Sequence, residues 1–326
     1  MEKPMTTIAV VEGDGIGHEV IPVARNVLEA MHPEFEFFPV DVGYGMWERT
    51  GCPCADKEIE ELKTADAILF GAVTTSPMKD YQSVVLRIRK ALDLYANLRP
   101  VKAEGFDIMI VRENTEGLYS GIEESGPDRA TTLRVVTRKG TERIVRSAIR
   151  LAEVRRGRLT IGHKANVLKS DVLFRDICLH EARTAGVIFN DKFIDALALD
   201  LLQHPEAYDV VVTTNIFGDI LSDVASYLVG GLGLVPSANI GDRYALFEPV
   251  HGSAPDIAGR NIANPIAAIR SAAMLLDYLG DKDGAGMVEA AVGMTISRGI
   301  RTRDLGGSAG TREFGDAVIK ALGRNR

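Results

Sequence analysis

The stretch VVEGDGIGHEV, residues 10–20, decides whether the chain carries a Rossmann phosphate loop. A strand-like apolar run over residues 8–11 meets three glycines at alternate positions, and a helical pattern follows. A Rossmann fingerprint requires G-x-G-x-x-G and, about 20 residues later, an acidic residue for the ribose. His18 stands where the third glycine belongs, and the candidate acid, Asp41, lies beyond that spacing. The loop is either a weak phosphate site or, as the pattern favours, a tight turn at the mouth of a cleft.

The composition is that of a globular protein that can bury a sizeable core. The 326 residues are 46% apolar and 25% charged, and the length predicts about two domains at ~150 residues each. The net charge of -7 argues against a general nucleic-acid binder. No apolar run approaches the ~20 residues that span a bilayer, and no signal segment is evident. We expect a cytoplasmic protein without membrane contact, in which Cys52, Cys54 and Cys178 are reduced thiols rather than a zinc site.

Strand-like and helix-like segments alternate along most of the chain, which predicts a mostly parallel sheet covered by helices. The segment 117–137 differs, because Gly and Pro interrupt it before an extended run over residues 131–137, and it predicts a protruding hairpin. Strands are expected at 8–11, 35–40, 67–73, 158–162, 187–189 and 210–213, and helices at 18–30, 56–63, 83–92, 170–183, 220–228, 265–279, 285–296 and 311–322.

Two aspartates in FGDILSD suit a divalent metal. Asp219 and Asp223 are four residues apart and share one face of the predicted helix, directly after a strand. Oxygen ligands at the end of a sheet suit Mg²⁺ or Mn²⁺. Asp195, in FIDALALD, is a candidate third carboxylate. The alternative is an ordinary pair of solvated carboxylates.

Three arginines, Arg89, Arg99 and Arg112, fall near the ends of predicted elements in an acidic protein. Guanidinium groups bind carboxylates in a bidentate manner, so a cluster implies a substrate with more than one carboxylate. The alternative for each arginine is a surface salt bridge. Tyr119 and Lys164 are candidate acid or base groups.

The segment EPVHGSAPDIAGRNIANP, residues 248–265, is rich in small residues and has the composition of a long loop, which is more often functional than structural. Asp256 can accept hydrogen bonds from ribose hydroxyls, and the following helix offers its N-terminus to phosphate.

Taken together, these segments resemble the isocitrate/isopropylmalate dehydrogenase family, the metal-dependent β-decarboxylating dehydrogenases. The resemblance runs through EGDGIGHEV, LDLYANLRP, RENTEGLY, HKANVLK, FGDILSD, GGLGL, HGSAPDIAG and DLGG in that order. It implies a two-domain α/β fold with a shared twisted sheet, not a Rossmann domain. A large domain would comprise residues 1–95 plus 231–326, and a small one residues 96–230. An arm at about 117–137 would clasp a second subunit into a homodimer, with tetramers as a further possibility.

The resemblance also implies a role for each candidate residue. The malate carboxylates are held by Arg89, Arg99 and Arg112, with Ser83 and Asn166 as further substrate contacts. Asp219 and Asp223 bind the metal together with Asp195 of the partner subunit, and Tyr119 and Lys164 of the partner subunit transfer protons. The cofactor residues are His251, Gly252, Ser253, Ala254, Asp256, Ile257 and Asn264.

The cofactor is expected to be NAD, because relatives that use NADP carry Lys and Tyr where this chain has Asp256 and Ile257. A carboxylate accepts hydrogen bonds from both ribose hydroxyls and repels a 2′-phosphate, a preference of roughly 1.4–3 kcal/mol. The GDGIG loop then becomes the cleft-side turn of the first strand, and its glycines serve a tight turn and close approach.

The substrate is expected to depend on the helix before Arg89. Ser83 resembles isocitrate enzymes, the apolar Val85 and Leu86 resemble isopropylmalate enzymes, and the combination resembles archaeal-type homoisocitrate enzymes. We expect NAD-dependent, Mg²⁺- or Mn²⁺-dependent oxidative decarboxylation of homoisocitrate or isocitrate. The alternative is 3-isopropylmalate, with tartrate or malate more remote. A regulatory nucleotide-binding module or a structural dimer would need neither the arginines nor the aspartate pair.

Overall fold

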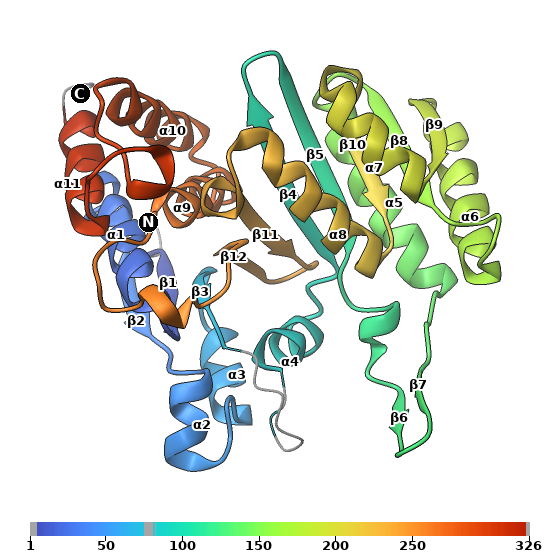
Figure 1. Ribbon diagram of the computed structural model, residues 1–326, viewed down its shortest axis with the longest axis horizontal. Helices are drawn as coiled ribbons and strands as arrows, with labels where there is room; N and C mark the ends of the chain where they lie inside the picture. Colours follow the sequence, from blue (N-terminus) through green and yellow to red (C-terminus); the bar gives the residue numbers. More distant parts are fainter. Residues whose placement is uncertain (1–4, 75–80, 82, 324–326) are drawn as a thin grey trace. The chain divides into compact units, whose positions relative to one another are not determined.

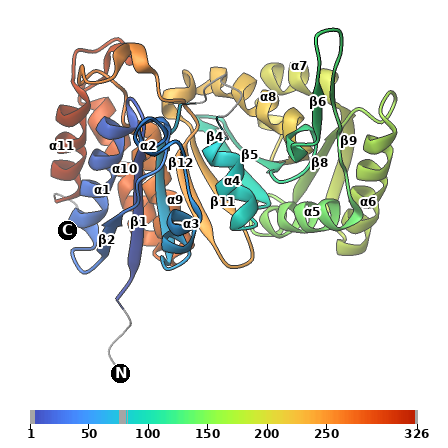
Figure 2. The same cartoon turned by 90° about the horizontal axis from the view of Figure 1, so that it is seen from below.

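The computed structural model describes residues 5–74, 81 and 83–323, which divide into two compact units (Figures 1 and 2). Unit 1 comprises Met1–Leu92, Leu232–Ala238 and Arg243–Arg326, and unit 2 comprises Asp93–Gly231 and Asn239–Asp242. The boundaries predicted at 95/96 and 230/231 lie close to these limits. Within the described ranges, no helix is long and apolar enough to cross a membrane.

The strands of unit 1 run in the order β2-β1-β3-β12 and continue to β11. β1 is parallel to β2 and β3, and β3 is parallel to β12, so their carboxyl ends lie at one edge. Every residue of β3 is buried, as a parallel strand covered on both faces requires. The bounds are β1 (Thr7–Gly13), β2 (Glu36–Pro39), β3 (Ala67–Ala72), β11 (Pro236–Ile240) and β12 (Ala245–Pro249).

Four long helices of unit 1 pack on one another, and two of them, α1 and α9, also pack on these strands (Figure 1). In α1, apolar residues recur at helical spacing and are buried, which explains why the segment forms an amphipathic helix. The four are α1 (Gly17–Met31), α9 (Ile266–Tyr278), α10 (Lys282–Ser297) and α11 (Thr311–Leu322). The shorter ones are α2 (Tyr44–Thr50), α3 (Asp56–Leu62), α4 (Val84–Ala91) and the 3₁₀ turns Leu232–Leu234, η5 (Pro255–Ile257) and Arg303–Leu305.

The strands of unit 2 run in the order β4-β5-β10-β8-β9. β4 is antiparallel to β5, whereas β5, β10, β8 and β9 are parallel. Residues 236–238 of β11 belong to unit 1 and residues 239–240 to unit 2, so this strand is common to both. The predicted α/β fold with a shared sheet is confirmed. The bounds are β4 (Ala96–Ala103), β5 (Phe106–Glu113), β8 (Arg158–His163), β9 (Ile188–Phe193) and β10 (Val210–Thr213).

Helices cover both faces of the unit 2 strands (Figure 2). Val210 and Val212 join a core with α5 (Arg138–Glu153) and α6 (Lys169–Ala185). Val211 points the other way, into a core with α7 (Ile194–Gln203) and α8 (Asn215–Ser226). Because side chains alternate along a strand, the run VVVT serves two cores. Short 3₁₀ turns lie at Pro205–Ala207 and Tyr227–Val229.

A hairpin extends from unit 2 (Figure 1). β6 (Glu123–Ser125) pairs antiparallel with β7 (Ala130–Thr132), and a bridge joins Gly117 to Val135 next to the turn Leu118–Ser120. The predicted hairpin is therefore present, although its strand ends at residue 132 rather than extending to 137. Ile122 and Leu133 are each more than half exposed on it. Its role as a dimer arm stays a prediction.

Several elements differ from the sequence-based expectation. No element was expected for α2, β4, β5, α5, α7, β11 or β12. The helix predicted at 220–228 begins at Asn215, because Thr214 adopts the extended N-cap conformation directly after β10. Asp219 therefore lies within the helix rather than one residue before its start, and Asp223 lies within it as predicted. All three cysteines are free thiols, as expected, and burial raises the pKa of Cys54 to about 11.

The GDGIG loop uses its backbone donors within the protein. The N–H of Asp14 donates to the Ala72 carbonyl at 2.7 Å, and the N–H of Ile16 donates to the Ser253 carbonyl at 2.8 Å. Gly15 has φ +58°, and a Cβ there would lie 2.1 Å from the Ser253 oxygen. A phosphate loop needs backbone N–H groups that point at the ligand. The loop is instead a tight, closely packed turn, which confirms that interpretation.

We predict that Gly17→Ala destabilises the protein. A Cβ at Gly17 would lie 2.0 Å from the Glu12 carbonyl oxygen, and such overpacking costs typically ~1–3 kcal/mol. Gly293→Ala, in α10 with open space around it, is the matched control and should stabilise by ~0.5–1 kcal/mol. Urea unfolding followed by circular dichroism measures both variants. A Gly17→Ala midpoint equal to that of wild type would contradict the predicted clash.

Candidate active site

Most of the candidate residues of unit 2 lie at or just after the carboxyl ends of four parallel strands. Arg112 is the penultimate residue of β5, and β10 leads directly into α8, which carries Asp219. β8 ends one residue before Lys164, and β9 ends two residues before Asp195. Ligand sites of open α/β sheets form at this edge, so the strand order explains why residues remote in sequence belong to one edge.

Arg112 is the buried centre of the first group, with only 2% of its side chain exposed. Its Nη1 pairs with Asp219, and its Nε and Nη2 donate to Asn215 Oδ1 at 3.1 and 2.7 Å. Gly218 allows this approach, because a Cβ there would lie 2.6 Å from Arg112 Cβ. The guanidinium is thus fixed from α8 on two sides.

Arg99 contacts both aspartates of α8. Its guanidinium lies 3.2 Å from Asp219 and 3.2 Å from Asp223, and it donates to Ser222 Oγ at 2.7 Å. The predicted sharing of one helix face by the two carboxylates is therefore confirmed. Burial raises the pKa of the Asp223 carboxyl, and repulsion from Asp219 adds to this, while Arg99 opposes it. Asn97 Oδ1 accepts the remaining Arg99 Nε–H at 2.8 Å.

Tyr119 completes this group. Its hydroxyl donates to Asp219 Oδ2 at 3.1 Å, and its ring lies 5.5 Å from the Arg112 guanidinium. A phenol that touches the carboxylate beside two arginines is positioned to exchange a proton with a ligand bound there.

Lys164 and Asp195 form a second group. Lys164 Nζ donates to Asp195 Oδ1 at 2.6 Å, and this hydrogen bond lowers the pKa of the Asp195 carboxyl. The backbone N–H of Lys164 donates at 2.6 Å to Asp171, which is fully buried. Arg134, at the base of the hairpin, pairs with Asp171 at 2.5 Å and donates to Thr214 at 2.9 Å. The Lys164 loop is therefore tied to the start of α8.

The predicted metal ligands are divided between these two groups. Asp219 and Asp223 belong to the first and Asp195 to the second. Across the described parts of the chain, no three His, Cys, Asp or Glu side chains come together as a metal-binding group. One chain thus supplies a pair of carboxylates at the Arg99 site. Asn166, a predicted substrate contact, is exposed after Lys164.

In unit 1, Arg89 is buried and pairs with Glu248 at 3.0 Å. Its Nε is buried without a hydrogen-bond partner among the described residues, so a donor remains for a bound anion. Ser83 caps α4, since its Oγ accepts the Leu86 N–H at 3.4 Å. Its hydroxyl hydrogen has no acceptor among the described residues. Arg87 pairs with Asp56 at 2.6 Å.

The predicted cofactor segment contains an unpaired buried acceptor. His251 Nδ1 lies 3.0 Å from the Gly252 carbonyl, which can only accept, so this nitrogen carries the hydrogen. Burial lowers the pKa of His251, which keeps the ring neutral. Its Nε2 is therefore an acceptor, and it is buried without a partner in the described structure. Ser253 Oγ lies 2.8 Å from Thr74 Oγ1.

The rest of this segment combines strain and exposure. Ala254 has φ +39°, an unusual conformation for a residue with a side chain. Asp256 is exposed and Ile257 half-buried, both in η5. Asn264 is engaged within the protein, because its amide donates to Asp304 at 2.8 Å and accepts the Ile266 N–H at 2.9 Å.

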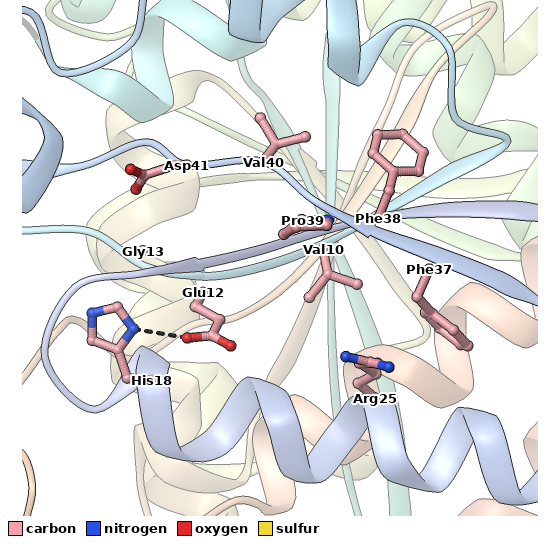
Figure 3. Close-up of a pocket in the computed structure, with 10 residues that line it drawn as sticks. All are labelled: Val10, Glu12, Gly13, His18, Arg25, Phe37, Phe38, Pro39, Val40 and Asp41. Carbon is pink, nitrogen blue, oxygen red and sulfur yellow. Dashed lines mark hydrogen bonds and ion pairs between the residues drawn. The ribbon is translucent and has the colours of Figure 1, made fainter.

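A cavity of about 290 Å³ lies beside β1, β2 and α1, where a Rossmann domain would hold its nucleotide (Figure 3). Its charged side chains pair with neighbours: His18 with Glu12 at 2.9 Å, and Asp41 with Arg49. Arg25, also in its wall, pairs with Glu29 at 2.5 Å. Carboxylates and ion-paired cations do not favour a phosphate, so the charges of this cavity do not support a Rossmann-type phosphate site. The remaining lining residues are Val10, Gly13, Phe37, Phe38, Pro39 and Val40.

Sequence reasoning missed the residues that support the site from a distance. Asn215 and Asn97 hold the two arginines, and Asp171 holds the Lys164 loop. Asn215 carried a signal, since a polar residue directly after a buried strand often faces a ligand edge. Asp171 carried none, because its partners are 7 and 37 positions away in sequence and their proximity arises only in the folded chain.

Comparisons with known proteins agree with this geometry. Residues 7–318 match the family described as isocitrate/isopropylmalate dehydrogenase. The chain is 50% identical to an isocitrate/homoisocitrate dehydrogenase of Thermus thermophilus, covering 97% of this chain and 98% of that protein. It is 47% identical to a 3-isopropylmalate/3-methylmalate dehydrogenase of Methanocaldococcus jannaschii, covering 98% and 99%. An isocitrate dehydrogenase structure from Methylococcus capsulatus superposes with a TM-score of 0.93 at 41% identity, covering 98% and 99%. The chain therefore belongs to the isocitrate/isopropylmalate dehydrogenase family, whose members are decarboxylating dehydrogenases that use a divalent metal and NAD(P).

Proposed function

We propose that the chain is an NAD-dependent, Mg²⁺- or Mn²⁺-dependent enzyme that oxidatively decarboxylates a 3-substituted malate, with homoisocitrate or isocitrate preferred. The observation that carries this proposal is the buried group in which Arg99 and Arg112 surround Asp219, with the Tyr119 hydroxyl on the same carboxylate. Two guanidinium groups bind a substrate with several carboxylates, and the aspartate pair suits a hard cation.

The residues present fit a divalent metal in their donor chemistry. Asp219 and Asp223 offer oxygen ligands on one face of α8, and their mutual repulsion adds to burial in raising the pKa of Asp223. A bound cation would relieve that repulsion. Asp195 would supply a third carboxylate from a second copy of the chain.

Bound metal and NAD supply, respectively, polarisation of the substrate oxygens and a hydride acceptor. The chain's own residues perform the remaining tasks. Arg89, Arg99 and Arg112 hold the malate carboxylates, and Lys164 accepts the proton of the hydroxyl group. The Tyr119 hydroxyl donates a proton to the carbon from which CO₂ departs.

The cofactor assignment rests on residues 251–264. The unpaired Nε2 of His251 can accept a hydrogen bond from an amino or hydroxyl group, which fits a nucleoside and not a phosphate. The exposed carboxylate of Asp256 suits ribose hydroxyls and disfavours a 2′-phosphate. Both features support NAD.

A homodimer with shared active sites is proposed on the division of the site into two groups. Among the described residues, the Arg99 group has neither a basic amine nor a third carboxylate, and the Lys164 group provides both. Exposed apolar side chains on the hairpin, Ile122 and Leu133, support an arm that contacts a second subunit. Pairing of dimers into tetramers remains an extension of this proposal.

The substrate preference rests on Ser83, whose hydroxyl hydrogen can reach a distal carboxylate. The alternative, 3-isopropylmalate, is favoured by the half-buried apolar Val85 and Leu86. Tartrate and malate, which lack the 3-substituent, are more remote substrates.

A substrate panel tests the function. With NAD and Mn²⁺, we expect kcat/KM for homoisocitrate or isocitrate to exceed that for 3-isopropylmalate by at least about tenfold, and chelation of the metal should abolish turnover. Ser83→Ala should reduce this ratio, because only the tricarboxylic substrates accept from the hydroxyl. Activity on 3-isopropylmalate alone would establish the alternative.

A cofactor comparison tests the role of Asp256. We expect kcat/KM for NAD to exceed that for NADP about 10- to 150-fold, the equivalent of roughly 1.4–3 kcal/mol. Asp256→Lys should reverse this order, since it replaces the repelling charge with an attracting one. Asp283→Lys, an equal charge change at an exposed site in α10, is the control. An unaltered preference in the Asp256 variant would refute the assignment.

A heterodimer tests the shared site. Asp195→Asn and Asp223→Asn should each abolish metal-dependent activity. A heterodimer of the two variants, purified through two affinity tags, should regain about half of the wild-type activity, because one of its two symmetric sites is intact. An inactive heterodimer would mean that each site is built within one chain.

A further inference from the structure

We propose that Glu19 is a positioning residue for the dinucleotide-binding segment. The inference rests on the proposed cofactor role of residues 251–264 and concerns what holds that segment in its binding conformation. Glu19 lies in the first turn of α1, some 240 residues away in sequence. No substrate or metal contact is assigned to it.

Both oxygens of the Glu19 carboxylate accept backbone hydrogen bonds from this segment. Oε1 accepts from the Gly259 N–H at 2.7 Å, and Oε2 accepts from the Asn261 N–H at 2.7 Å. Hydrogen bonds to a charged acceptor are shorter and stronger than neutral ones. Their two-point attachment fixes both the position and the direction of the backbone between Ile257 and Asn264.

The same attachment point is also held from α11. Gly259 has φ +75° and Asn261 has φ +54°, in the left-handed region that glycine and asparagine adopt readily. The Asn261 carbonyl and side chain also accept from the Thr311 and Arg312 N–H groups, each at 3.1 Å. The segment is thus held between the first turns of α1 and α11.

The GDGIG turn attaches the same segment at its other end. Ile16 donates to the Ser253 carbonyl at 2.8 Å, and only a glycine at position 15 leaves room for that carbonyl. The motif GDGIGHE therefore contacts the segment at Ser253 through its backbone and at Gly259 and Asn261 through Glu19. It acts on the cofactor by positioning other residues rather than by contacting phosphate.

Loss of this restraint should weaken dinucleotide binding selectively. Ordering a loosened loop adds an entropic cost to binding, and this cost applies to the cofactor whose contacts lie on residues 251–264. The substrate is held chiefly by Arg99 and Arg112 of unit 2, which Glu19 does not touch. A purely structural role would instead lower stability without separating the two ligands.

The test measures NADH binding directly. In Glu19→Gln, one carboxylate acceptor becomes an amide donor that faces a backbone N–H. We expect the Kd of NADH, measured by fluorescence titration without substrate, to rise about tenfold, the loss of one charge-assisted hydrogen bond. The KM of the hydroxy acid at saturating NAD and kcat should stay within about twofold.

Matched variants and a second readout complete the design. Glu29→Gln, which removes the partner of Arg25 on the same helix, should bind NADH like wild type. Glu19→Asp, which keeps the charge on a shorter side chain, should fall between Glu19→Gln and wild type and replaces Glu19→Gln if that variant does not fold. Hydrogen exchange of residues 254–264 in the cofactor-free protein should accelerate in Glu19→Gln and not in Glu29→Gln.

The outcomes separate the two proposals. If wild type binds NADH and the Glu19 variants bind it equally well, the positioning role is refuted and the proposed function stands. Glu19 variants with lowered stability but an unchanged Kd of NADH would likewise refute the positioning role and leave the proposed function standing. If wild type itself does not bind NADH, the assignment of residues 251–264 fails, and the inference about Glu19 fails with it.

Discussion

Parallel strand pairing is the constraint on which the rest of the structure depends. In unit 2, β5, β10, β8 and β9 end at one edge, and each leads into a candidate residue within a few positions. In unit 1, β1, β3 and β12 also end together, which brings the GDGIG turn to the segment that follows residue 250. Because a parallel sheet cannot place these ends elsewhere, side chains scattered over the sequence meet in two local groups.

Burial of charge is what makes these groups chemically specific. Arg112 and Arg99 are almost entirely buried, and a buried guanidinium must be paired and hydrogen-bonded to persist. Asp219 provides the pairing, Asn215 and Asn97 provide the directional acceptors, and Gly218 gives Arg112 the space to reach them. Asp219 compensates the charge of the arginines and is also proposed to bind the metal. A bound cation would therefore change a charge balance that already exists within the group.

Particular residues show how far sequence reasoning reaches. The spacing of Asp219 and Asp223 predicted a shared helix face, and His18 predicted that the opening loop is not a phosphate loop, because both depend only on local geometry. Some missed elements had readable signals. Residues 144, 145, 148, 149 and 152 of α5 follow the helical period, and Gly105, with φ +90°, marks the two-residue turn between β4 and β5. Contacts such as that of Glu19 with Asn261 had no such signal in the sequence.

The sequence by itself determined the family, the α/β class and the identity of the chemical groups, because motif order, hydrophobic pattern and residue type are properties of the chain. Tertiary structure alone decided which of those groups touch. Lys164 pairs with Asp195 rather than with the Asp219 group, and the GDGIGHE motif contacts the segment after residue 250 through Glu19. The physical reason is that such contacts join residues from separate strands and helices, and their distances are set by sheet order and packing, which no local pattern encodes.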